Sequence, residues 1–182
     1  MADLTTLAKV KEWIPNYSGT ADDALLTRLI SAASDYIETY LNRGLLSQAY
    51  TTQRDGNGGT RLMFLNYPVT AVSLVKVDQQ TIPASVNGSP GYVFDSTSVA
   101  LIGYTFTRGY QNVSLNYTAG YATIPNEIEQ ACIELAALRY RDRERIGIQS
   151  KGMSGETITF SKKDFTDGIE QTLRQYRRVM LP

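Results

Sequence analysis

The stretch IPNEIEQACIELAALRYRDRERIG, residues 124–147, predicts one long helix that decides the fold. Pro125 stands just inside its start, where a missing backbone donor is tolerated, and Gly147 just past its end can adopt a left-handed conformation. Residues 131–138 contain one polar side chain, Glu134, and a helix that is apolar on nearly all sides is buried on nearly all sides. The following turns change to arginines and acids. We therefore expect the first half of this helix in the core and the second half facing water or a partner.

Three further helices are predicted around it. Apolar residues at helical spacing indicate a short helix over residues 5–14 and a long one that Thr20 caps and Gly44 ends. After a glycine-rich loop, a last helix begins near residue 163. Its apolar face is formed by Phe165, Ile169, Leu173 and Tyr176.

Residues 45–120 change to alternation, β-branched residues and turns. The glycine-rich turn of residues 55–59 predicts a hairpin between strands over residues 49–54 and 60–66. Apolar residues on both faces of a strand over residues 70–77 indicate a central position. Shorter strands are expected over residues 92–94, 99–102, 104–108 and 113–117.

These patterns predict an α+β fold: a bundle of about four helices with an inserted antiparallel sheet, because helical and strand patterns are segregated along the chain. We expect one domain over residues 1–182. Its helical core comprises residues 1–44 and 121–182, and the β insert comprises residues 45–120.

Composition narrows the class of protein. No run approaches the ~20 apolar residues of a membrane helix, and residues 1–6 lack the features of a secretion signal, which predicts a cytosolic protein when it is made. Formal charge is zero, which argues against gripping nucleic acid over the whole surface. Residues 139–182, however, hold ten Lys/Arg against six Asp/Glu, a mildly basic end on a mildly acidic body.

An enzyme is the least supported class. The chain has no histidine, which removes Ser-His-Asp and Cys-His nucleophile pairs, histidine zinc sites and the commonest general base near neutral pH. Its single cysteine, Cys132, lies in an apolar helical run and is expected to be a packed thiol. The turn of residues 55–59 lacks the spacing of a calcium or phosphate loop. We expect no catalytic residue, metal or cofactor.

Two groups of residues are candidates for binding. The first is basic and spreads around the end of the long helix: Arg139, Arg141, Arg143 and Arg145. It is either a solvated end laced with ion pairs of ~0.3 kcal/mol each or a surface for an acidic partner or a phosphate backbone. The second mixes charge with apolar anchors in the loop and the C-terminus, and is either an interface or a disordered loop and frayed tail. It comprises Ile158, Phe160, Arg174, Tyr176, Arg177, Arg178, Met180 and Leu181.

Several segments in a defined order resemble the head–tail connector proteins of tailed bacteriophages, also called adaptor, head completion or DNA-packaging connector proteins. The order of helix pair, β insert, proline-started helix, polar loop and terminal helix carries the resemblance, although the β insert is longer than in the small all-helical members. The matching segments are residues 4–11, 22–33, 37–43, 67–72, 117–121 and 124–131.

This resemblance implies a structural virion protein without enzymatic activity. Such proteins form a ring, usually of about twelve copies, beneath the portal and prolong the DNA channel. The implied partners are the portal protein, a downstream tail or stopper protein and transient non-specific DNA, with no membrane. The implied locations are the host cytoplasm during assembly and then the head–tail junction of the virion. The alternative is a stand-alone nucleic-acid-binding module that uses the basic C-terminal end.

Overall fold

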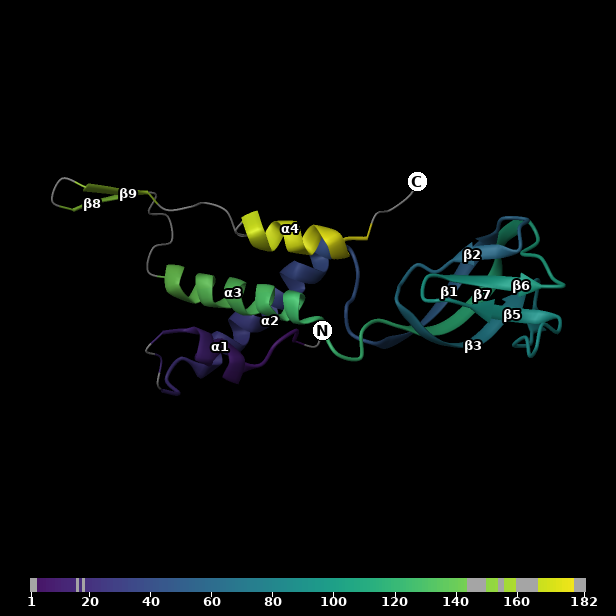
Figure 1. Ribbon diagram of the computed structural model, residues 1–182, viewed down its shortest axis with the longest axis horizontal. Coiled ribbons are helices and arrows are strands. Elements are labelled where there is room, and N and C mark those ends of the chain that lie inside the picture. The colour runs from purple at the N-terminus through teal and green to yellow at the C-terminus, as the bar shows by residue number, and fades with distance from the viewer. Residues whose placement is uncertain are drawn as a thin grey trace. The chain divides into compact units, whose positions relative to one another are not determined.

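The computed structural model describes residues 3–15, 17, 19–143, 150–153, 156–159 and 167–178. The chain divides into two compact units, Met1–Arg43 with Ile124–Pro182 and Gly44–Thr123 (Figure 1). The helices belong to the first unit, and the two larger sheets belong to the second. The α+β class predicted from the sequence is therefore confirmed.

The helical unit is organised around α3 (Asn126–Asp142), which contacts α1 (Leu7–Trp13), α2 (Asp23–Leu41) and α4 (Asp167–Tyr176). Because helices contact α3 from several sides, its apolar residues do not form a single stripe. Gly147, the predicted end, lies outside the described residues. The first half of the helix is core as expected, since its buried side chains are Ile128, Ala131, Cys132, Ile133, Leu135, Ala136 and Ala137.

The ends of α2 differ from the prediction. The helix begins after Asp22, where Thr20 was the expected cap, and it ends at Asn42, two residues before Gly44. Asn42 has a left-handed backbone (φ 56°), and the short polar side chain of asparagine makes this conformation less costly than for other non-glycine residues. Asparagine can therefore end a helix where glycine was expected.

The β unit consists of two antiparallel sheets. The four-stranded sheet has the order β1-β7-β3-β4, formed by Gln48–Gly56, Gly109–Ala119, Val69–Val77 and Gln80–Ile82. The three-stranded sheet has the order β2-β6-β5, formed by Arg61–Met63, Ser98–Ile102 and Gly91–Phe94. The predicted strands over residues 70–77, 92–94, 99–102 and 113–117 are thus present, and β3 is an inner strand as expected.

The hairpin predicted at residues 55–59 is wrong. β1 pairs with β7, and β2 pairs with β6, so the turn carries the chain from one sheet to the other. Phe106 holds the turn through its backbone: its carbonyl accepts from Gly58 N–H at 2.6 Å, and its N–H donates to the Gly59 carbonyl at 2.8 Å. Turn residues specify that the chain reverses, but they do not specify which strand follows as a partner.

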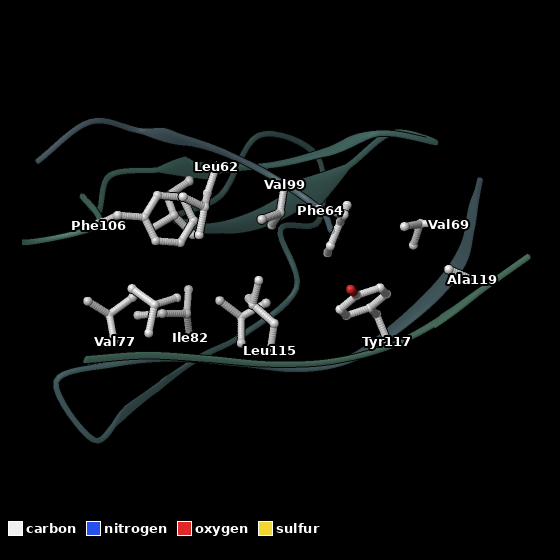
Figure 2. Packing of buried hydrophobic residues seen from close by; sticks show 13 residues of the cluster. Leu62, Phe64, Val69, Val77, Ile82, Val99, Phe106, Leu115, Tyr117 and Ala119 are labelled. Atoms are coloured by element: carbon white, nitrogen blue, oxygen red, sulfur yellow. The ribbon is translucent and has the colours of Figure 1, made fainter. Parts of the chain in front are cut away.

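The predicted strand over residues 104–108 is also wrong, because this segment is irregular. Phe106 is nevertheless fully buried between the two sheets. Figure 2 shows Leu115 and Tyr117 of the four-stranded sheet facing Leu62, Phe64 and Val99 of the other layer. The rings of Phe64 and Tyr117 lie 4.6 Å apart between centroids. The two sheets therefore share one apolar core.

Candidate assembly surfaces

The basic end of α3 is joined to the start of α2 through one carboxylate. Asp22 Oδ2 accepts hydrogen bonds from Tyr140 OH and from Arg143 Nη1, the latter at 3.0 Å. The Tyr140 hydrogen bond, followed by that of Arg143, holds the pKa of the Asp22 carboxyl below its ordinary value. Arg143 Cζ also lies 4.2 Å from the centre of the Tyr140 ring. Arg143, predicted as a partner-facing residue, thus joins two helices.

The other predicted arginines of α3 have different surroundings. Arg139 Cζ lies 5.0 Å from the ring centre of Tyr36 on α2, a contact worth ~0.5–1 kcal/mol at an exposed site. Arg141 is exposed, and in the part of the chain that the structure describes no ion pair, hydrogen bond or ring contact engages it. Arg145 lies outside the described residues. No described residue therefore compensates the charge of Arg141.

Arg174 of α4 and Arg177, just after its end, converge on one tyrosine of α2. Arg174 Nη2 lies 2.7 Å from Glu170 Oε1, one turn earlier. The hydrogen bond to Glu170, and after it one to Tyr40, raises the pKa of Arg174 above its ordinary value. Arg177 Cζ lies 5.4 Å from the ring centre of the same Tyr40. These predicted interface residues also fasten α4 to α2.

The end of α4 is tied to two other helices. Tyr176 OH donates to Glu127 Oε2 at 2.9 Å, at the start of α3. The backbone N–H of Arg178 donates to the Leu41 carbonyl at 2.9 Å, at the end of α2. The chain is therefore fixed to the helical unit as far as Arg178.

The remaining predicted interface residues lie at the limits of the described chain. β8 (Ser150–Met153) and β9 (Glu156–Thr159) pair antiparallel, so the alternating run that contains Ile158 forms a strand. The side chain of Ile158, like Phe160, Met180 and Leu181, lies outside the described part of the chain.

An acidic groove of about 540 Å³, missed at the sequence level, lies between α1 and the first half of α3. Its apolar surface comes from Trp13, which is 50% exposed, and from Ile133. Lys9 Nζ is paired with Glu129 Oε1 at 2.7 Å. The lining consists of Lys9, Glu12, Trp13, Asn126, Glu129, Gln130 and Ile133.

A second groove, of about 410 Å³, lies between α3 and α4. Gln130 lines both grooves, so the two grooves lie on either side of a ridge of α3. The side-chain amide of Gln130 donates to Glu134 Oε1 at 3.0 Å. Glu127, Glu129 and Glu134 make this half of α3 acidic, whereas its last turns are basic. A single helix therefore carries two surfaces of opposite charge.

The three-stranded sheet exposes apolar side chains on its outer face. Leu62 lies opposite Val99 and faces the core, so the alternate residues face outward. Met63, Val93 and Ile102 are among them, with exposed fractions of 57%, 41% and 37%. The short strands β2 and β5, with their mixture of polar and apolar residues, gave little sequence signal for this face.

Across the described ranges, no group of three or more Cys, Asp or Glu side chains could hold a metal ion. No helix in those ranges is long and apolar enough to cross a bilayer.

The fold is that of proteins found in the necks of phage-like particles. The chain is similar to a neck component of an empty gene transfer agent particle computed with C6 symmetry, with 20% identity, a TM-score of 0.60 and coverage of 96% of this chain and 90% of the other. A neck component of the native particle computed with C12 symmetry gives 18% identity, a TM-score of 0.60 and coverage of 97% and 90%. A chain of the native gene transfer agent virion gives 21% identity, a TM-score of 0.59 and coverage of 96% of this chain and 90% of the other.

The sequence identifies the family directly. Residues 3–179 match the model of the head completion protein family, and the chain belongs to this family. No curated protein matches the chain. The resemblance to the head–tail connectors of tailed bacteriophages, drawn from the matching segments and their order and spacing, is thereby confirmed.

Proposed function

We propose that this protein is a structural, non-enzymatic subunit of the head–tail connector, that it forms a ring of about twelve copies beneath the portal, and that it extends the DNA channel. The observation that carries the proposal is the family match over residues 3–179, almost the whole chain. The similarity to a neck component computed with C12 symmetry supports the twelvefold ring.

In this proposal the whole chain, residues 1–182, acts as one connector domain. Residues 1–44 and 121–182 form a helical bundle, and residues 45–120 are an inserted sheet subdomain. The portal protein binds on one side of the ring and a tail or stopper protein on the other, while DNA passes without lasting contact. Subunits assemble in the host cytoplasm and end at the head–tail junction of the virion.

A stand-alone nucleic-acid-binding module draws less support. Its basis is the basic C-terminal end, yet Arg139 and Arg177 lie over tyrosine rings, and Arg143 and Arg174 are paired with carboxylates. Arginines that already hold helices together have less freedom to follow a phosphate backbone.

The proposal is tested by mixing the purified protein with purified portal rings and imaging the product by electron cryomicroscopy. We expect added density beneath the portal with the rotational order of the ring. Portal rings mixed with an unrelated neutral protein of similar size serve as the control. Portal particles that carry no added density at saturating protein would overturn the connector assignment.

A further inference from the structure

We propose that the acidic groove between α1 and α3 receives the tail segment, residues 177–182, of a second copy of this chain. The inference rests on the proposed ring. A ring is built from head-to-tail contacts, in which two different patches of one subunit must complement each other. The groove and the tail segment are such a pair.

The groove offers apolar surface beside negative charge. Trp13 has half of its surface exposed, and Ile133, which is 6% exposed, also lines the groove. The lining holds one cation against two carboxylates, a net charge of −1, and that cation, Lys9, is paired with Glu129. Glu12 is exposed and has no ion pair or hydrogen bond within the described residues. No described residue of the same subunit therefore compensates its charge.

The tail segment has the complementary chemistry. Its sequence is RRVMLP, in which two cations precede three consecutive apolar residues. Arg177 stays over Tyr40 of its own subunit. Methionine and leucine can fill an irregular apolar groove, and the side chain of Arg178 can pair with an exposed carboxylate at the rim. The combination of a basic and an apolar part matches Glu12 and Trp13.

The position of the tail segment favours a second copy over its own chain. The N–H of Arg178 is fixed to the Leu41 carbonyl, so the four residues after it reach at most about 14 Å. α1 and α4 contact α3 on opposite sides (Figure 1). Packed helix axes lie roughly 8–10 Å apart, so crossing α3 requires about twice that distance. This reach is too short for the chain's own groove, and we therefore assign the tail segment to the groove of a neighbour.

Engineered cysteines test this contact directly. A chain carrying Glu12→Cys is mixed with a chain carrying Met180→Cys on portal rings and oxidised mildly at pH 8. Burial raises the pKa of the native Cys132 thiol to about 11, so this thiol stays protonated and does not compete. We expect an interchain disulfide between the two variants, since such a bond needs Cα atoms within about 7 Å.

Two controls make the result decisive. Asp35→Cys, on the exposed face of α2, replaces Glu12→Cys and should give no cross-link above background. A double variant, Glu12→Cys with Met180→Cys, is oxidised alone at high dilution. An intrachain disulfide there, without dimer, would overturn the proposal, because the tail would then occupy its own groove.

Tryptophan fluorescence gives a second readout without portal. Trp13 is the single tryptophan of the chain. We expect the peptide RRVMLP to shift the emission of Trp13 to shorter wavelength in a saturable, salt-sensitive manner. Glu12→Gln should weaken the affinity for the peptide about fivefold. A peptide with serine at its three apolar positions should have no effect.

The outcomes separate this inference from the connector proposal. Rings on the portal without cross-link or fluorescence change would overturn the groove assignment and leave the connector function intact. A cross-link and peptide binding without rings on the portal would support the groove contact while removing the connector function.

Discussion

At the scale of single residues, a side chain can be buried in the core although its backbone does not belong to a strand. Residues 104–108, with Tyr104 and Phe106 two positions apart, predicted a short strand, because a period of two is typical of a half-buried strand. In the structure Phe106 is buried, but its backbone bonds the turn glycines Gly58 and Gly59 and not a neighbouring strand. Over five residues, alternation indicates which side chains are buried without showing what their backbone pairs with.

Phe106 should therefore be one of the most sensitive positions of the β unit. Phe106→Ala leaves a cavity between the two sheets, and we expect the free energy of unfolding to fall by about 3–5 kcal/mol. Tyr110, which is 83% exposed, is the matched control, and Tyr110→Ala should change the free energy of unfolding by less than about 0.5 kcal/mol. Urea denaturation followed by circular dichroism measures both. Equal losses in the two variants would contradict the assignment of Phe106 to the core.

Cys132 gives a prediction for alkaline pH. Burial raises the pKa of its thiol from 9.0 to about 11, because the thiolate is disfavoured in the core. A raised folded-state pKa stabilises the protein fully below the unfolded value, and this contribution disappears as pH rises through the folded value. The stability of the native protein relative to Cys132→Ala should fall between pH 9 and pH 11, by on the order of 2–3 kcal/mol.

The native protein and Cys132→Ala contain the same tyrosines, so the effect of tyrosine titration on stability cancels in the difference between them. Denaturation curves at several pH values give the difference. A difference that stays constant over this range would show that the thiol ionises as readily in the folded chain as in the unfolded one.

At the scale of elements, helix positions could be predicted and strand partners could not. The apolar run before Arg139 and the proline at the start of α3 are local signals. The apolar run lies where the sequence places it, and Pro125, predicted just inside the helix, is the capping residue immediately before it. The turn after β1 is also a local signal, but the strands on its two sides, β1 and β2, pair with β7 and β6, which lie far along the chain. At Gly56 a Cβ would lie 1.7 Å from the Thr107 carbonyl, a tertiary approach that no local pattern reveals.

The contact between α2 and α3 should be sensitive to acid. Hydrogen bonds from Tyr140 and then Arg143 lower the pKa of the Asp22 carboxyl, so their stabilising contribution is present above its unfolded pKa of ~4 and is lost as pH falls below it. We expect Tyr140→Phe to lower the melting temperature near neutral pH. The difference from the native protein should shrink below about pH 4.

Tyr110→Phe, at an exposed tyrosine of the β unit, is the matched control and should melt like the native protein throughout. Melting curves recorded by circular dichroism across acidic pH give both differences. If the effect of Tyr140→Phe is the same at acidic and neutral pH, the hydroxyl does not stabilise the helix contact through the ionised carboxylate.

At the scale of the whole molecule, the sequence located charged segments but not the grooves. The candidate arginines and the tail segment were visible because charge and apolar anchors are adjacent in sequence. The acidic groove combines Trp13 with Ile133, residues more than a hundred positions apart, and only the packing of α1 on α3 brings them together. Trp13 belongs to the apolar spacing of the first helix, so its exposure could not be read from that spacing.

Contact with DNA should be weak, independent of sequence and strongly dependent on salt. In the proposed ring the DNA must be able to slide, and phosphate contacts are lost as counterions compete. Arg141, exposed on α3, is one residue through which such contact can occur. Fluorescence anisotropy with labelled duplexes of unrelated sequence, between low and physiological salt, measures it. Tight, sequence-selective binding by the isolated protein would favour the nucleic-acid module instead.

Truncation at the C-terminus separates folding from assembly. A chain of residues 1–178 keeps the hydrogen bond from Arg178 to Leu41 and the position of Arg177 over Tyr40, so its unfolding free energy should change by less than about 0.5 kcal/mol. A chain of residues 1–176 loses both contacts and should lose roughly 1–2 kcal/mol. Both chains lack the apolar anchors after Arg178, so we expect both to occupy portal rings less fully than the native protein. Full occupancy by residues 1–178 would show that residues 179–182 have no part in attachment, and unfolding of this chain would place them in the core.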